Sequence, residues 1–157
     1  MSIDRVKAYF RELGVEDKVQ ELKMSSATVE LAALALGVES GRIAKTLSFM
    51  VNEQPILIVA AGDVKIDNAK YKKFFGAKAK MLTPDEAVSL IGHAVGGVCP
   101  FAVNEGVTVY LDESLKKYVT VFPACGSSNS AIELTMEELE NYSLCKEWID
   151  VCKLKEA

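Results

Sequence analysis

The sequence predicts an α+β (mixed α/β) fold, in which a mixed β-sheet of about six or seven strands closes partly into a barrel and helices flank it. Helix-like and strand-like segments both occur, but their order is irregular, so the β-α-β repeat of a doubly wound fold is not indicated. The chain has 157 residues, of which 50% are hydrophobic and 25% charged. This composition is typical of a globular protein, and we expect a single domain over residues 1–157.

Two helices are predicted near the N-terminus. Apolar residues recur at helical spacing from Ile3 to Leu13, and a glycine follows as a stop. Thr28 can cap a second helix that ends at Gly37. Because residues 31–36 are all alanine or leucine, we expect this second helix to be buried on every side.

The strand signals begin in the middle of the chain. Residues 46–51 and 56–61 are strand-like and are joined by Asn52-Glu53-Gln54-Pro55, which predicts a hairpin. The later predicted strands are 107–111, 118–122, 130–134 and, less clearly separated from a helix, 148–152.

Three further helices have clear start signals. Asp67 can cap a lysine-rich helix that reaches Phe75. Thr83-Pro84-Asp85-Glu86 combines a cap, a proline at the first helical position and a capping-box glutamate, and this helix should end at Gly92. Thr135 opens another capping box.

The charge of the chain is unevenly distributed. The net charge is −4, which argues against a large nucleic-acid footprint. Residues 65–80, however, hold six lysines and one aspartate, a local net charge of +5. Such a run is either a solvated helix face or a weak, salt-dependent contact for a phosphate backbone.

Several classes of site are not supported by the sequence. Four cysteines without a Cys-x-x-Cys pair, and a single histidine, do not suggest a metal site, and we expect no cofactor. The lysine in Gly37–Thr46 does not directly follow the second glycine, so the segment is not a P-loop. No apolar run approaches the roughly 20 residues of a membrane span. The first residues also lack an apolar signal core, so a cytoplasmic protein is expected.

The segment from Gly92 to Phe101 is the first candidate for a functional loop. It combines three glycines, the only histidine and a proline, so its backbone should be rigid and its N–H groups available to a ligand. A tight turn between strands is the alternative. His93 itself fits either a structural cap just beyond a helix C-terminus or the base of a Ser–His or Cys–His arrangement.

Lys45 is the second candidate. It lies at the start of a predicted strand among apolar neighbours, where an ammonium is costly unless it reaches water or an anion. Together with N–H groups of the Gly96-Gly97 loop, it would form a small pocket for an anionic, acylated ligand. The alternative is a side chain that extends to solvent or pairs with an acid.

Four segments, taken together and in order, resemble a known family. They are Ser26-Ala27-Thr28-Val29-Glu30-Leu31-Ala32-Ala33, Ile43-Ala44-Lys45-Thr46-Leu47, Gly92-x-x-x-Gly96-Gly97-Val98-x-Pro100-Phe101 and Gly126-Ser127-Ser128-Asn129-Ser130-Ala131-Ile132-Glu133-Leu134. On these segments the chain resembles the YbaK/ProX (YbaK/EbsC) family of aminoacyl-tRNA editing domains. The resemblance implies a YbaK-like barrel-like sheet and hydrolysis of the ester that joins a wrong amino acid to the 3′ end of a tRNA.

The resemblance also implies roles for individual residues. Lys45 matches the family lysine that holds the phosphate and ribose of the terminal adenosine, while Gly96 and Gly97 match the glycine pair of the aminoacyl pocket. These three are the candidate catalytic residues. The candidate substrate-binding residues are Thr28, His93, Val98, Pro100, Gly126, Ser127 and Ser128.

The loop at Pro123-Ala124-Cys125-Gly126-Ser127 bears on specificity. Members of the alanyl-prolyl editing type carry a histidine-proline pair there, so this chain is closer to the YbaK/EbsC side, and editing of the Cys-tRNA(Pro) type is expected. The expected partners are the aminoacylated 3′ end of tRNA and, as a candidate, prolyl-tRNA synthetase, with no membrane and no DNA. Because no side chain is an obvious activated nucleophile, a non-catalytic module that binds tRNA 3′ ends or a synthetase is the alternative.

Overall fold

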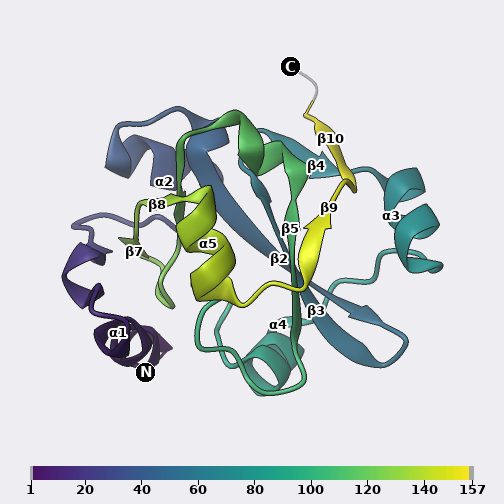
Figure 1. Ribbon diagram of the computed structural model, residues 1–157, viewed down its shortest axis with the longest axis horizontal. Coiled ribbons are helices and arrows are strands. Elements are labelled where there is room, and N and C mark those ends of the chain that lie inside the picture. The colour runs from purple at the N-terminus through teal and green to yellow at the C-terminus, as the bar shows by residue number, and fades with distance from the viewer. Residues whose placement is uncertain (1, 156–157) are drawn as a thin grey trace.

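A curled, mixed sheet of six strands forms the centre of the computed structural model, which describes residues 2–155 (Figure 1). Its strand order is β8-β6-β2-β3-β5-β9. The bounds are β2 (Ile43–Val51), β3 (Gln54–Ala61), β5 (Thr108–Asp112), β6 (Thr120–Pro123), β8 (Leu134–Thr135) and β9 (Glu147–Ile149). The pairs β2–β3 and β6–β8 are antiparallel, whereas β2–β6, β3–β5 and β5–β9 are parallel. The predicted mixed, partly closed sheet with flanking helices is confirmed.

Two pairs of short strands and five α-helices accompany this sheet, together with 3₁₀ turns at Glu16–Lys18, Ser40–Arg42 and Glu113–Lys117. The short pairs are β1 (Gln20–Glu21) with β7 (Ser130–Ala131), and β4 (Val64–Ile66) with β10 (Cys152–Leu154). The helices are α1 (Ser2–Glu12), α2 (Val29–Leu36), α3 (Asn68–Phe75), α4 (Pro84–Glu86) and α5 (Met136–Ser143). None of the helices within residues 2–155 is long and apolar enough to cross a membrane.

The β2–β3 hairpin fixes the position of the central strands. Val51 pairs with Gln54, which leaves Asn52 and Glu53 as a two-residue turn in which both residues have positive φ, at 48° and 67°. Turns of this kind match the twist of the strands they join. Residues 56–61 of β3 are buried throughout, so this strand lies at the centre of the hydrophobic core.

The predicted helix signals operate as expected. The side chains of Thr28, Asp67, Thr83 and Thr135 each accept a backbone N–H in the first turn of their helix, and the last two complete capping boxes. Beyond α4 the backbone continues as a π-helical turn, Ala87–Ile91, before it stops at Gly92 with φ at +99°.

The structure corrects the prediction that the second helix is buried. In α2 only Ala32 is buried, whereas Leu31 is 42% and Leu34 71% exposed. The helix rests against β2 and β6 along one side, through a small cluster that includes Ile43 and Phe122. An apolar sequence therefore does not give burial here, because nothing in the described chain covers the outer side.

Two predicted strands are divided in the structure. The predicted strand 130–134 becomes β7 and β8, because the Ile132 N–H donates to the Pro123 carbonyl between them and the chain changes partners. The predicted strand 148–152 becomes β9 and β10. There the Asp112 carboxylate accepts the Val151 N–H at 2.9 Å, and the Val151 carbonyl accepts from Asp67.

Candidate functional site

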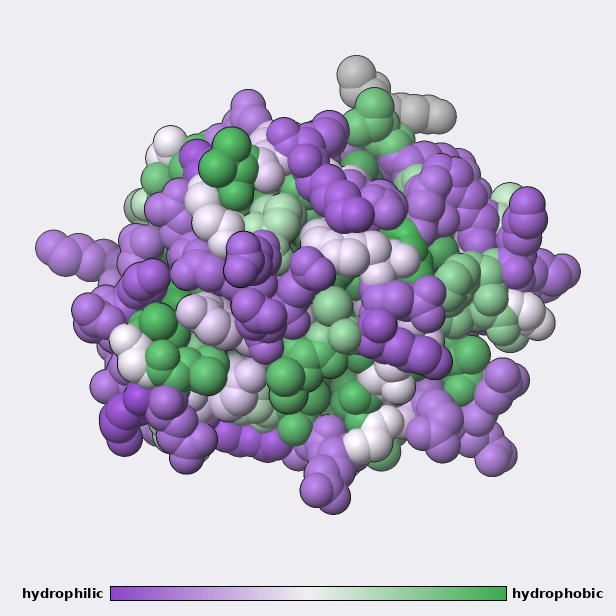
Figure 2. All heavy atoms as spheres, viewed as in Figure 1, coloured by the Kyte–Doolittle hydropathy of each residue, from purple (hydrophilic) through white to green (hydrophobic). Residues whose placement is uncertain are grey.

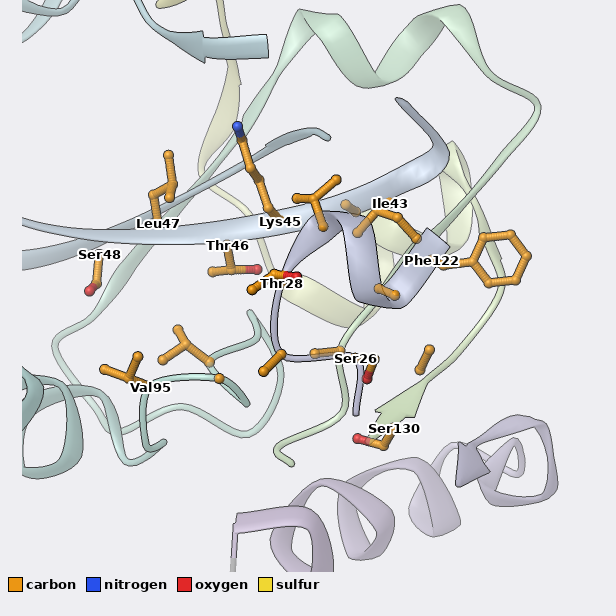
Figure 3. Close-up of a pocket in the computed structure, with 18 of the residues that line it drawn as sticks. Ser26, Thr28, Ile43, Lys45, Thr46, Leu47, Ser48, Val95, Phe122 and Ser130 are labelled. Carbon is orange, nitrogen blue, oxygen red and sulfur yellow. The ribbon is translucent and has the colours of Figure 1, made fainter. Parts of the chain in front are cut away.

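A cavity of about 280 Å³ opens beside β2, next to the loop that precedes α2 (Figure 3). Small and apolar side chains dominate its wall, together with several hydroxyl groups. The lining residues lie within 26–32, 43–48, 81–82, 95–98 and 122–131. Segments that are far apart in the sequence therefore meet at this cavity.

The outer edge of β2 is unpaired over a short stretch beside the cavity. Ala44 pairs with β6, and farther along the backbone groups of Ser48 and Met50 bond to residues 80–82. Backbone groups of a regular strand alternate between its two edges. The N–H and C=O of Thr46, two residues before Ser48, consequently point out of the same edge, in the gap between the two partners.

The side chains of β2 alternate between the two sides of the strand at this gap. Lys45 and Leu47 project to one side, whereas Thr46 and Ser48 project to the other, on which Val95 lies (Figure 3). This is the period of two expected of a strand. The Thr46 hydroxyl is buried and has no hydrogen-bond partner among the described residues.

Lys45 lines the cavity, but its ammonium turns away from the glycine loop. The ammonium donates to the carbonyl of Val64 in β4, and it is only half-buried. Burial lowers the pKa of the Lys45 ammonium, and the like charge of Lys155 lowers it further. The expected arrangement, with the ammonium facing Gly96 and Gly97 across one pocket, is therefore not present. The Lys45 side chain instead extends from the side of β2 opposite to Thr46 and Val95.

The two glycine-bearing loops are in direct contact. A Cβ atom at Gly97 would lie 2.7 Å from the carbonyl carbon of Gly126, so only glycine permits this approach. Gly96, at φ +96°, lines the cavity next to Ser128. The Gly97 N–H donates to the Ala94 carbonyl within the turn, whereas the Gly96 N–H has no partner among residues 2–155.

The serines that follow Gly126 support the wall of the cavity through hydrogen bonds. The Ser128 carbonyl accepts the Ser26 N–H at 2.6 Å, which ties this loop to the segment before α2. The Ser127 hydroxyl donates to the Ser130 hydroxyl at 2.8 Å. Ser130 lines the cavity, and Ser127 and Ser128 support the wall.

His93 lies outside the cavity and is 1% exposed. Its Nδ1 accepts from the Ser2 hydroxyl, and its Nε2 contacts the carbonyl of Phe101 at 2.8 Å and the thiol of Cys99 at 3.6 Å. Burial lowers the pKa of the imidazole. This environment is that of a structural histidine. Pro100 also lies away from the cavity, against a separate hollow.

The cysteines do not supply an activated nucleophile. Cys99 and Cys125 are fully buried, and neither lines the cavity. Burial raises the pKa of Cys99 to about 12 and that of Cys125 well above its usual value, so both are protonated thiols at neutral pH. No group of histidine, cysteine, aspartate or glutamate side chains in residues 2–155 could hold a metal ion.

The predicted site residues thus fall into three groups. Those that line the cavity are Thr28, Lys45, Gly96 and Val98. Those that support its wall are Gly97, Gly126, Ser127 and Ser128. His93 and Pro100 lie elsewhere. Thr46 and Ser48 also line the cavity and were not among the predicted site residues, although strand alternation places them on the side opposite Lys45.

Comparisons with known proteins identify the family of this chain. Residues 24–142 match the family model described as "Aminoacyl-tRNA editing domain". The uncharacterized protein YwhH of Bacillus subtilis is 56% identical over 154 residues, which is 98% of each chain. EbsC of Enterococcus faecalis, described as a proposed Cys-tRNA(Pro)/Cys-tRNA(Cys) deacylase, is 31% identical over 71% of this chain and 70% of its own.

A solved structure is similar along its whole length. The crystal structure of a proposed trans-editing enzyme for prolyl-tRNA synthetase superposes with a TM-score of 0.85 at 33% identity, and the match covers 99% of this chain and 98% of that one. The segments that form the cavity lie within or close to the matched family region. This chain therefore belongs to the aminoacyl-tRNA editing domain family.

Proposed function

We propose that this chain is an aminoacyl-tRNA deacylase that acts in trans and hydrolyses the ester of a mischarged tRNA, with Cys-tRNA(Pro) as the favoured substrate. Family membership and the likeness to EbsC support the reaction class. The observation that carries the proposal is the cavity at the open edge of β2, which has a lysine on one side and small, hydroxyl-bearing walls on the other.

The two sides of the strand edge suit the two parts of such a substrate. The Lys45 ammonium, on the outer side, offers a point charge for the phosphate and ribose of the terminal adenosine. The aminoacyl group then enters the cavity on the side of Thr46 and Val95. The ester that joins the two parts crosses the edge at the Thr46 backbone.

The cavity has room for the aminoacyl group of such a substrate. A volume of about 280 Å³ lies near the lower limit for ligand pockets, which begins at roughly 300 Å³. The hydroxyl-bearing residues of the wall offer polar atoms to a short side chain such as that of cysteine. A separate editing step is useful here because two amino acids that differ by one small group are discriminated by a synthetase by only about 1–3 kcal/mol of binding free energy.

The chemistry requires only water and well-placed donors. Water adds to the ester carbonyl carbon, the bond from that carbon to the ribose oxygen breaks, and the ribose oxygen takes a proton as the amino acid leaves. The negative charge that develops on the carbonyl oxygen can be stabilised by the N–H groups of Thr46 and Gly96. Since no activated side chain faces the cavity, the attacking group is water, positioned by the protein or by the substrate itself.

The central test is release of amino acid from mischarged tRNA by Lys45→Ala. The purified protein is mixed with Cys-tRNA(Pro), Ala-tRNA(Pro) and correctly charged Pro-tRNA(Pro). We expect cleavage of the first in preference to the others. In the variant we expect a loss of about 10²-fold, because the terminal adenosine loses the contact that positions the ester. Lys146→Ala, which changes an exposed lysine between α5 and β9, should retain full activity.

Three outcomes would contradict parts of the proposal. Full activity of Lys45→Ala in a folded protein would exclude Lys45 as the substrate contact. Preferential cleavage of Ala-tRNA(Pro) would overturn the specificity but retain the reaction. Saturable binding of tRNA without ester cleavage, for every pairing, would support the non-catalytic module, which the lack of an activated nucleophile favours.

A further inference from the structure

A set of exposed lysines on and around α3 forms no ion pairs within residues 2–155. We call it the basic surface, and it comprises Lys65, Lys72, Lys73, Lys78 and Lys80. Every surface ion pair of the described chain lies elsewhere, apart from that of the neighbouring Lys70 with Asp150. Hydrophilic side chains project from this end of the molecule, around α3 (Figure 2).

The local structure brings these charges together without compensating them. Lys65 in β4 pairs directly with Lys153 in β10, so two cations face each other across the strands, an arrangement that is unfavourable on its own. Lys72 and Lys78 line one hollow between α3 and the segment that follows it. Asp67, the acid within this stretch, is engaged in capping α3.

The basic surface reaches the rim of the cavity from two directions. On one side, Lys80 directly precedes Met81, which lines the cavity, and the Lys80 carbonyl bonds to the edge of β2. On the other side, the Lys45 ammonium bonds to the carbonyl of Val64, the residue before Lys65. A polyanion lying on this surface would therefore end beside Lys45.

We propose that the basic surface binds the phosphate backbone of the tRNA acceptor arm and directs its 3′ end to the cavity; the identity of the RNA rests on the proposed function above. Lysine ammonium groups are suited to phosphates as point charges. The net charge of the whole chain is −4, so this local concentration of positive charge can orient the RNA on an otherwise acidic protein. Contact with a few phosphates carries no sequence information, which fits a protein that reads the end of the molecule.

The test is the binding of uncharged tRNA(Pro) as a function of salt. The triple variant Lys72→Gln/Lys78→Gln/Lys80→Gln removes three charges and leaves the cavity intact. We expect its affinity to fall about tenfold or more at low salt, and the slope of log K against log salt to decrease by about 3, one unit per phosphate contact. Lys146→Gln is the matched control and should bind like the parent protein.

A second measurement separates this proposal from the proposed function. Both proteins are assayed on cysteinyl-tRNA(Pro) and on cysteinyl-adenosine, which has the ester but no acceptor arm. The triple variant should lose activity on the tRNA, through a higher KM, and keep it on the small ester. If the triple variant binds tRNA with unchanged affinity and an unchanged salt slope, the proposed role of the basic surface is contradicted, whatever the deacylase activity.

Two further outcomes have a definite meaning. If neither protein cleaves either ester but the triple variant binds tRNA more weakly, the deacylase function fails and the basic surface stands. If vesicles of acidic phospholipid bind the parent protein through these lysines and tRNA does not, the surface serves a membrane and the proposal is overturned.

Discussion

His93 is the only histidine of the chain, and its imidazole is held between the N-terminal residues and the glycine loop. From the sequence, a structural and a substrate-binding role were both open. The structure places the ring in the core, where the Ser2 hydroxyl and the Phe101 carbonyl occupy its two nitrogen atoms. Sequence position alone could not decide this, because the Ser2 hydroxyl belongs to a residue 91 positions away and reaches the ring only after folding.

Burial of His93 predicts a specific dependence of stability on pH. Because its pKa in the folded protein lies below the ordinary value of 6.5, the unfolded chain binds the proton more readily. The free energy of unfolding should therefore fall as the pH drops below 6.5, by at most about 1.4 kcal/mol per pH unit until the lowered pKa is passed. Urea unfolding at pH 7.5, 6.5 and 5.5 measures this fall.

The matched control for this prediction is His93→Gln, which retains polar atoms but has no titration in this range. Its stability should be lower overall and flat between pH 7.5 and 5.5. A single imidazole resonance in the NMR spectrum reports the pKa directly. A value above 6.5 would contradict the buried, neutral ring.

At the level of elements, the sequence predicted where helices begin and end better than it predicted what packs against them. The caps at Thr28, Asp67, Thr83 and Thr135 depend on contacts within a few residues, and all four are confirmed. The β2–β3 hairpin is similarly local. The predicted burial of α2 was wrong, and the predicted strand 148–152 is divided into β9 and β10. Both features depend on partners far along the chain, such as the Asp112 carboxylate that accepts the Val151 N–H.

The exposure of α2 gives a simple test of that correction. Leu34→Gln replaces a side chain that is 71% exposed, so the free energy of unfolding should change by less than about 0.5 kcal/mol. The contrasting variant is Leu139→Gln in α5, whose side chain is fully buried. There we expect a loss of at least about 2 kcal/mol. Equal losses in thermal or urea unfolding would show that α2 is covered in solution.

The candidate site could be predicted in part, because some of its residues are marked by local sequence patterns and others depend on distant partners. The glycine loop and Lys45 stand out in the sequence, and the cavity includes Lys45, Gly96 and Val98. The direction of the Lys45 side chain and the exposed peptide of Thr46 depend on where β6 ends and where residues 80–82 begin to pair. No local pattern encodes that gap.

For the whole molecule, α1 connects the core to both glycine-bearing loops. Phe10 is fully buried and packs against Phe101, with ring centroids 4.9 Å apart and ring planes tilted by 59°. At the start of α1, Ser2 bonds to His93 and packs against Gly126. The helix thus supports the wall of the cavity without lining it, which makes the site dependent on the N-terminal part of the fold.

Phe10→Ala tests this dependence. Truncation of a fully buried phenylalanine should lower the free energy of unfolding by about 3–5 kcal/mol, measured by urea denaturation. Leu13→Ala, at an apolar position that is 43% exposed, should cost about 1 kcal/mol or less. A small effect of Phe10→Ala would mean that α1 is not an integral part of the core.

The unpaired edge of β2 has a consequence for how the protein behaves at high concentration. Open strand edges invite a strand from another molecule to add on, which leads to aggregation. Here the break in pairing lies between Ala44 and Ser48, so the backbone of Thr46 alone faces outward. An opening this short admits a compact chemical group but gives an incoming strand too few hydrogen bonds to hold, so access for a small ligand does not come with a template for self-association.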